Sequence, residues 1–395
     1  MPQEEPKTVR IPGTSHLTAR HTGALLLATY SLVLCAGAVA ANAVAAPVSP
    51  HARIVGYATD WDLAQDKDAG KIDVLIFAFA KVVDDRVVLD SAGEEHLRRL
   101  TALKAMHSAL RVTVSVGGWG AGGFSEAAGS EAGRRAFAAS AAQLVTRLDA
   151  DGLDVDWEYP EHGESGIHSS VQDRANFTLL LKAIRSSLDE AGAARGRSGA
   201  DHYILTIAAA DGPFVSGIDI AAVAPYLDWF NLMTYDFVNS LTPSTGHHTG
   251  LHASKLTPAG ARTTERAVRQ FRSAGVPPGK LMIGAAFYGR EFGDVQADRH
   301  GRYQPYGHYL GERPWPQLKS DYIDSHGYVR YWDRAAQAPW LWNAQTRRFV
   351  SYDDPQSIAA KAAYVKALHL GGIMYWEQHL DPSGELLDAA WRGLD

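Results

Sequence analysis

Eight short apolar runs, separated by longer amphipathic stretches, are the feature that most restricts how this chain can fold. They begin at Ile54, Asp73, Arg111, Gly152, Tyr203, Trp229, Leu281 and Gly371. Nearly every residue in them is apolar, which is typical of parallel strands buried on both faces. The stretches between them have helical spacing, so strands and helices alternate. Eight such units predict an α/β fold, a (β/α)8 TIM barrel.

The last amphipathic stretch carries clear helix signals. Asp354 is expected to be the N-cap of this helix, and Pro355 its first helical residue. Apolar residues then recur at helical spacing as far as Leu368. The glycines that follow, Gly371 and Gly372, are expected to end the helix.

The gap before the eighth run is too long for a single helix. About 80 residues separate Phe287 from Gly371, whereas a loop and one helix use about 25 to 40. Residues 291–350 are rich in aromatic side chains and contain short β-like pieces such as GYVRYW. We therefore expect a small α+β insertion between strands 7 and 8, beside the mouth of the barrel.

Residues 1–46 differ from the rest of the chain. Two arginines precede an apolar stretch, and small residues follow it, which is the layout of a secretory signal peptide. We expect cleavage near Ala43 to Ala46, a secreted protein, and a barrel domain at 47–395. An uncleaved membrane anchor formed by the same segment is the alternative.

Composition excludes several classes of protein. Hydrophobic residues make up 46% of the chain and charged residues 21%, as in ordinary soluble globular proteins. The formal net charge of -6, with no basic cluster, argues against a nucleic-acid partner. The only cysteine, Cys35, lies in the N-terminal segment, so the mature chain is expected to hold no disulfide. We expect a monomer without a stable membrane partner.

The run DGLDVDWEYP at 151–160 places three carboxylates at alternate positions. Because successive side chains of a strand point to opposite faces, Asp154, Asp156 and Glu158 are expected to point into the barrel. Burying like charges about 6 to 7 Å apart should raise at least one of their pKa values. Glu158, the last inward position, would meet the mouth where barrels bind substrate, which suits a general acid.

A solvated loop or a calcium site would fit this run less well. A solvated acidic loop would not need the apolar residues that alternate with the acids. A calcium loop of the EF-hand type needs a glycine at its sixth position and a late glutamate, and neither fits from Asp151 or Asp154. Asp151 is instead expected to cap or brace the start of the strand. No third ligand accompanies His247 and His248 at metal spacing, so we predict no metal and no cofactor.

The acidic run resembles the DxxDxDxE signature of the chitinases of glycoside hydrolase family 18. Other segments resemble motifs of that family in the same order: SVGGW from Ser115, MTYDF from Met233, TGHHTGL from Thr245, FYGREF from Phe287 and GGIMYWE from Gly371. The resemblance covers residues 54 to 380, and the insertion is of a kind found in one branch of the family. One departure is Leu241 or a neighbour, where some members carry a tryptophan.

The resemblance implies hydrolysis with retention by substrate-assisted catalysis. Glu158 would protonate the glycosidic oxygen and later activate water, while Asp156 would orient the substrate acetamide and stabilise the oxazolinium intermediate. Asp154 would support Asp156, and Tyr235 would hydrogen-bond the acetamide carbonyl. The residues implied to bind substrate are Tyr57, Phe79, Trp119, Met233, Asp236, Tyr288, Arg290 and Trp376. Trp376 would form an apolar floor under the sugar.

Plain structural roles compete with several of these assignments. The aromatic residues could belong to the core, and Arg290 could form a surface salt bridge. Three functions stay open. A chitinase would act on chitin or N-acetylglucosamine oligomers; an endo-β-N-acetylglucosaminidase would use the same acids on other glycans. A chitin-binding lectin on the same barrel is disfavoured because Glu158 is present.

Overall fold

The computed structural model describes residues 52–59 and 63–395. The expected signal peptide, its cleavage region and Cys35 lie outside these described residues. Within the described part of the chain, no helix has the length and apolar character needed to cross a bilayer.

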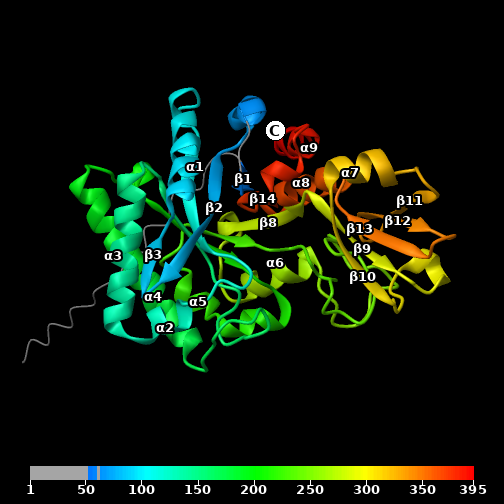
Figure 1. The fold of residues 1–395 in the computed structure, drawn as a ribbon, viewed down its shortest axis with the longest axis horizontal. Coiled ribbons are helices and arrows are strands. Elements are labelled where there is room, and N and C mark those ends of the chain that lie inside the picture. The colour runs from blue at the N-terminus through cyan, green and yellow to red at the C-terminus, as the bar shows by residue number, and fades with distance from the viewer. Residues whose placement is uncertain (1–51, 60–62) are drawn as a thin grey trace, which may run out of the picture. The chain divides into compact units, whose positions relative to one another are not determined.

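Eight parallel strands close into a barrel within the described residues (Figure 1). They are β1 (Arg53–Ala58), β2 (Val74–Val83), β4 (Arg111–Gly117), β5 (Gly152–Asp156), β6 (Ile204–Ala209), β7 (Trp229–Leu232), β8 (Leu281–Ala286) and β14 (Gly372–Trp376). Closure follows because β1 pairs in parallel with both β2 and β14. The TIM-barrel prediction is confirmed, since each of the eight apolar runs supplies one strand. A short strand, β3 (Arg86–Val88), extends β2 as an antiparallel hairpin.

Helices cover the outside of the barrel (Figure 1). They are α1 (Ser91–Ala102), α2 (Phe124–Gly129), α3 (Glu131–Arg147), α4 (Asp173–Ala194), α5 (Ile220–Val223), α6 (Thr264–Ser273), α8 (Pro355–Leu368) and α9 (Glu385–Leu394). Short 3-10 segments are η1 (Leu63–Lys71), η2 (Leu103–Ala105), η3 (Gly199–Asp201), η4 (Gly212–Gly217), η5 (Pro278–Lys280), η6 (Asp298–Gly301) and η8 (Gln378–Leu380). The outward strand residues pack on these helices in the largest buried cluster. A smaller cluster fills the barrel interior.

Helix α8 begins as predicted and ends earlier than predicted. Asp354 accepts a hydrogen bond from the Ser357 amide, and the Ser357 side chain accepts one from the Asp354 amide, which completes a capping box. The helix ends at Leu368, not at the two glycines. His369 takes a left-handed conformation with φ of 52° and its amide bonds back to the last turn, which leaves Gly372 to begin β14.

A five-stranded antiparallel sheet lies between β8 and α8 in the chain. Its order is β10 (His308–Pro314), β9 (Tyr288–Gly293), β13 (Arg348–Tyr352), β12 (Ala338–Asn343) and β11 (Tyr328–Asp333), with the short α7 (Trp315–Gln317) and the π segment η7 (Leu318–Tyr322) beside it. The sheet runs from Tyr288 to Tyr352, whereas the insertion was expected at 291–350. Since β8 ends at Ala286, β9 starts almost directly from the mouth of the barrel.

Candidate active site

The alternation expected along β5 is present. Leu153 and Val155 are fully buried in the outer core, and the Trp157 ring stacks on Phe124 at 5.4 Å and meets Phe177 edge-on at 5.3 Å. These contacts fix the outward face of the strand. Asp154 and Asp156, which alternate with these residues on β5, therefore point into the barrel, as a strand's period of two requires. Glu158 lies two residues beyond the end of the strand.

Asp154 is fully buried and is held by donors from four other strands. Its Oδ1 accepts from Thr206 Oγ1 at 2.6 Å and from Asn231 Nδ2 at 3.1 Å. Its Oδ2 accepts from Ser115 Oγ at 2.7 Å and from Tyr57 Oη at 2.9 Å. Burial raises the pKa of Asp154, and the four hydrogen bonds partly oppose that rise.

Sequence reasoning missed three of these donors. Ser115, Thr206 and Asn231 are polar residues at buried positions within otherwise apolar strands. That contrast was a usable signal, because a buried polar side chain needs a partner. The sequence does not show that all three contact Asp154, because only the closure of the barrel brings them together.

Asp156 has a different environment. It is buried, yet its Oδ1 has no hydrogen-bond partner in the described part of the chain. Burial, then the negative charges of Glu158 and Asp154, raise the pKa of Asp156 well above its ordinary value. An unpaired buried oxygen is costly, so this carboxyl group is suited to a hydrogen bond with a bound molecule.

Glu158 follows β5 at the mouth and is partly exposed. Burial raises the pKa of Glu158 to about 7; a hydrogen bond from Tyr159 lowers it and the charge of Asp236 raises it. Ser165 Oγ donates to the Glu158 carbonyl at 2.7 Å and braces the backbone. A carboxyl group with a pKa near neutrality can both give and accept a proton.

Asp236 lies opposite, in the segment after β7. Tyr288 Oη donates to its Oδ1 at 2.9 Å, and Arg290 binds both oxygens, through Nε at 2.7 Å and Nη2 at 2.5 Å. His248 Nδ1 lies 3.5 Å from Oδ1. Burial alone would raise the pKa of Asp236, but His248 and Arg290 hold it well below its usual range. Arg290 therefore forms a mostly buried, two-pronged ion pair in place of the surface salt bridge considered above.

The segment that carries Asp236 departs from the expected strand. The run WFNLMTYDF continues past the mouth, but β7 ends at Leu232. The Thr234 amide donates back to the Leu232 carbonyl at 2.7 Å. The amide of Gly284 on β8 donates to the Thr234 hydroxyl at 2.6 Å, so a side-chain oxygen accepts here in place of a backbone carbonyl of β7. Asp236 then adopts a positive φ of 54°. This turn directs its side chain toward β9.

Aromatic residues line the barrel interior and its mouth. The Trp376 ring lies 5.7 Å from the nearly parallel ring of Phe79 and 5.7 Å from Tyr57. Trp376 and Phe79 are partly exposed, but Tyr57 is 1% exposed and its hydroxyl is taken by Asp154. Tyr57 is therefore engaged with Asp154, and its contact with the sugar stays a prediction.

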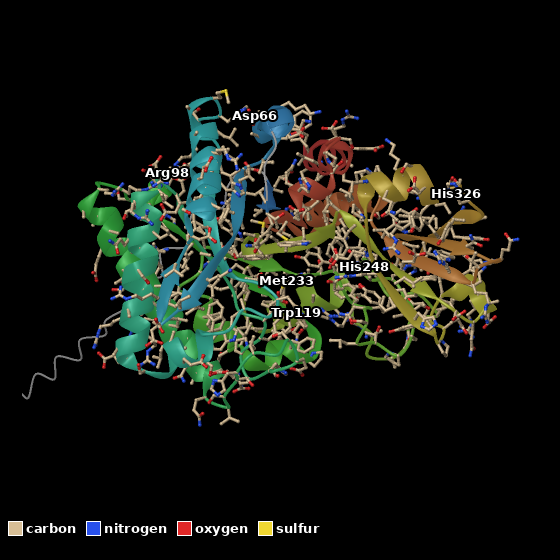
Figure 2. All side chains as sticks on the ribbon, in the orientation of Figure 1. Asp66, Arg98, Trp119, Met233, His248 and His326 are labelled. Carbon is tan, nitrogen blue, oxygen red and sulfur yellow. The ribbon has the colours of Figure 1, made fainter. Side chains whose placement is uncertain are left out.

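The remaining predicted residues fall into buried and open positions. Tyr235 is buried, with Oη 3.7 Å from Met374 Sδ. Tyr288 is 2% exposed and donates its hydroxyl hydrogen bond to Asp236. Met233 packs at the edge of the inner cluster. Trp119, after β4, is 57% exposed with its ring 6.3 Å from that of Tyr159. Met233 and Trp119 are labelled in Figure 2.

The two neighbouring histidines contact separate carboxylates. His247 Nε2 lies 3.3 Å from Asp333 of the second sheet, whereas His248 lies beside Asp236. Within the described residues, no cluster of three or more histidine, cysteine or acidic side chains has a metal-binding arrangement. Leu241, which stands at or near the position where some family members carry a tryptophan, is 63% exposed.

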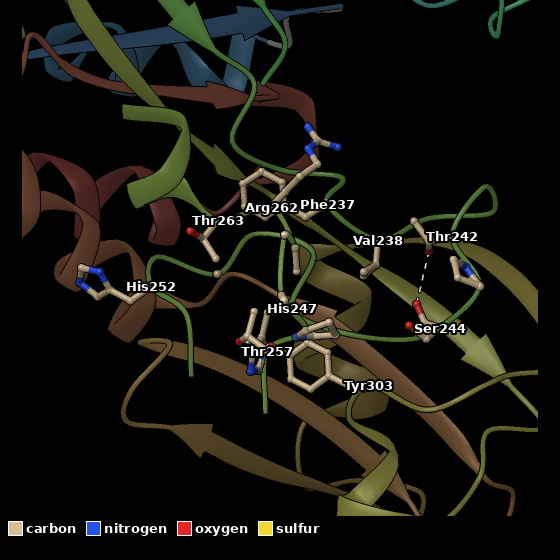
Figure 3. A pocket seen from close by; sticks show the side chains of 16 residues that line it. Phe237, Val238, Thr242, Ser244, His247, His252, Thr257, Arg262, Thr263 and Tyr303 are labelled. Atoms are coloured by element: carbon tan, nitrogen blue, oxygen red, sulfur yellow. Dashed lines mark hydrogen bonds between the residues drawn. The ribbon is translucent and has the colours of Figure 1, made fainter. Parts of the chain in front are cut away.

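A separate pocket of about 270 Å³ lies beside the Asp236 segment (Figure 3). Phe237, His247, Tyr303 and Arg262 are among its lining residues, and none of the three acids of the β5 run lines it. We assign the active site to the acids, because their perturbed pKa values and convergent geometry provide chemistry that this pocket lacks.

A row of buried acids that ends in a near-neutral carboxyl group at the mouth of a TIM barrel is the arrangement of a general acid in a glycoside hydrolase. Residues 53–381 match the sequence profile described as Glycosyl hydrolases family 18, and the chain belongs to this family.

Named relatives agree with this assignment. The chain is similar to chitinase A1 of Niallia circulans, with 36% identity over 298 residues, which is 71% of this chain and 42% of that protein. It is 30% identical to chitinase B of Serratia marcescens over 366 residues, 77% of this chain and 71% of that protein. A solved family 18 N-acetylglucosaminidase from Paenibacillus barengoltzii superimposes with a TM-score of 0.82 and 43% identity, over 87% of this chain and 100% of that one.

Proposed function

We propose that this enzyme is a chitinase that hydrolyses β-1,4 linkages between N-acetylglucosamine units. The observation that carries the proposal is the acidic row, in which Asp154 is saturated with hydrogen bonds, Asp156 has a free buried oxygen and Glu158 has a pKa of about 7. Chitinase names among the relatives support the substrate class.

The first chemical step forms a ring on the substrate itself. Glu158 gives its proton to the glycosidic oxygen, and the acetamide carbonyl oxygen of the same sugar attacks the anomeric carbon as the bond to the leaving group breaks. The resulting oxazolinium ion is positively charged. The free oxygen of Asp156 accepts the acetamide N–H and stabilises that charge, and Asp154 keeps Asp156 in place.

In the second step, water attacks the oxazolinium ion from the side that the leaving group left. Glu158, now ionised, takes a proton from water, and the water oxygen attacks the anomeric carbon and opens the oxazolinium ring. Two inversions leave the anomeric configuration retained. Tyr235 would donate to the acetamide carbonyl, Met233 and Asp236 would line the same subsite, and Trp376 with Phe79 would pack against the apolar face of the sugar.

Release of single N-acetylglucosamine units is a second candidate. The solved relative with 43% identity is named an N-acetylglucosaminidase and is covered over its whole length. The catalytic acids would act in the same way, and only the length of the product would differ. Hydrolysis of N-acetylglucosamine linkages in other glycans stays a third possibility for the same acids.

A time course on defined N-acetylglucosamine oligomers, tetramer to hexamer, tests the proposal. We expect short products whose anomeric configuration, followed by NMR at early times, is retained. Single sugars released from the outset would favour the second candidate, and a glycoprotein substrate assayed in parallel would reveal the third. No turnover of any such oligomer would refute the proposal.

Two controls isolate the mechanism. Glu158→Gln should lower kcat by about 10² to 10⁴ while the protein still binds the oligomer. A lectin would bind the oligomer without turnover in the wild type as well. Fully deacetylated oligomers of the same length should not be cleaved, because they lack the internal nucleophile. Equal turnover of both substrates would contradict substrate assistance.

We also propose that the protein is secreted after cleavage near Ala43 to Ala46 and acts as a monomer. The residue pattern of the N-terminal segment supports cleavage. N-terminal sequencing of protein from the culture medium tests it. A full-length product that stays with the membrane fraction would favour the anchor.

A further inference from the structure

A second charged pair contacts the backbone carbonyl of Asp236, whereas Arg290 binds its carboxylate. Arg262 precedes α6, and its Nε donates to Asp211 Oδ1 at 2.6 Å; Nη2 donates to the same oxygen. Its Nη1 donates to the carbonyl of Asp236 at 3.2 Å. Asp211 is 3% exposed and follows β6. The guanidinium therefore connects the loops after β6 and β7.

The pair lies at the mouth of the barrel, the face on which TIM-barrel enzymes build their active sites. Asp236 has a φ of 54°, a conformation that residues other than glycine rarely adopt. Arg262 also lies over the ring of Phe237, with Cζ 4.9 Å from its centre, and Figure 3 shows the two side chains together at the edge of the pocket. The carbonyl of this strained residue thus accepts from Arg262 at 3.2 Å and, at 3.4 Å, from Asn239 Nδ2, while its carboxylate is bound by Arg290.

We propose that Arg262 and Asp211 are positioning residues for catalysis, because they hold the Asp236 backbone in the conformation that places its carboxylate near Glu158. Arg262 touches no reacting atom, and Asp211 keeps its guanidinium aligned. The inference rests on the function proposed above, in which Asp236 lines the acetamide subsite. Without the pair, the Asp236 segment relaxes and its carboxylate moves. The transition state of the reaction then loses more stabilisation than the bound substrate does.

The chain offers a matched control in Arg330 and Asp354. Arg330 also binds a buried aspartate through Nε at 3.0 Å and Nη2 at 2.6 Å, and it also lies over an aromatic ring, that of Trp332 at 5.6 Å. Side-chain exposure is 26% for Arg330 and 6% for Asp354, against 19% and 3% in the other pair. Asp354 caps α8, so this pair has a structural role away from the acids.

The test compares Arg262→Met with Arg330→Met for thermal stability and for steady-state kinetics on an N-acetylglucosamine hexamer. Both variants should melt a few degrees lower than the wild type. Arg262→Met should lose about tenfold in kcat with KM changed less than about threefold, whereas Arg330→Met should keep both within about twofold. Arg262→Lys retains a charge that can reach the Asp236 carbonyl, and it should recover part of the lost kcat.

The outcomes separate this inference from the proposed function. An inactive wild type would refute the function. An active wild type with equal kinetics in Arg262→Met and Arg330→Met would overturn the inference, and so would a loss confined to KM. If Arg262→Met does not fold, Asp211→Asn and Arg262→Lys, which change the pair less, should each lower kcat more than Arg330→Lys does; equal kcat values would again overturn it.

Discussion

The hydroxyl of Tyr57 donates a hydrogen bond of 2.9 Å to Oδ2 of Asp154, a residue 97 positions further along the chain. The bond joins β1 to β5 through the barrel interior. It supplies one of the donors that keep Asp154 in a single orientation beneath Asp156. Asp154 therefore also links strands of the barrel to one another.

Removing this donor should weaken both the fold and the reaction. In Tyr57→Phe the buried carboxylate loses one partner, and hydrogen bonds to charged groups contribute about 1.5 to 3 kcal/mol, so the free energy of unfolding in urea should fall by that amount. We expect kcat to fall as well, because Asp154 supports Asp156. Tyr328→Phe is the control, since Tyr328 donates at 2.7 Å to buried Glu291 in the second sheet. It should lose stability and keep kcat; a normal kcat in Tyr57→Phe would show that the hydrogen bond from Tyr57 does not contribute to catalysis.

Activity should fall as pH rises through neutrality. Burial raises the pKa of Glu158 to about 7, and a general acid must hold its proton in the free enzyme. The alkaline limb of kcat/KM against pH should therefore have its midpoint near 7. The charge of Asp236 also raises this pKa, so Asp236→Asn should move the limb to lower pH. A limb that stays in place would show that the charge of Asp236 does not raise this pKa, and a profile without a limb near 7 would contradict the role of Glu158 as the acid.

The same carboxyl group should make stability depend on pH. Its folded pKa of about 7 exceeds its ordinary value of 4.5, so between these values the folded state binds more protons than the unfolded state does. Stability then falls as pH rises through this window. Relative to Glu158→Gln, the wild type should lose about 3 kcal/mol between pH 4.5 and 7, at about 1.36 kcal/mol per pKa unit. Urea unfolding of both proteins at several pH values measures this difference; parallel curves would contradict the raised pKa.

Lys361 should be indispensable for stability. It is fully buried, and its Nζ donates to Asp353 Oδ2 at 2.6 Å, Thr249 Oγ1 at 2.5 Å and the Gly284 carbonyl at 3.0 Å. Lys361→Met leaves Asp353 buried without its charge partner and should lower the free energy of unfolding by about 3 to 5 kcal/mol.

Two comparisons test whether the buried, unpaired charge causes the loss at Lys361. The double variant with Asp353→Asn should recover part of the loss, because it removes that charge. Lys319→Met breaks a salt bridge to Glu385 whose lysine is 57% exposed, and it should cost about 0 to 1 kcal/mol. Equal losses in the two lysine variants would show that burial of the pair has no energetic consequence.

Much of the fold and the core of the site followed from local pattern. Apolar runs predicted the eight strands, and the alternation of Asp154, Asp156 and Glu158 with apolar residues predicted which side chains face inward. The first inference rests on the continuous apolar character of parallel strands buried on both faces, and the second on the period of two that every strand has. The end of β7 could not be predicted in this way, because Thr234 replaces a ladder bond with its side chain.

The sequence by itself determined the strands, the direction of the acids and the identity of the residue at the mouth, since these depend on neighbours along the chain. Only the tertiary structure decided which groups surround each acid. Tyr57, Thr206 and Asn231 meet at Asp154 because barrel closure and strand register bring them there. The same holds for Arg262 at Asp236. Such partners set the pKa values and the geometry, and distance along the chain carries no information about them.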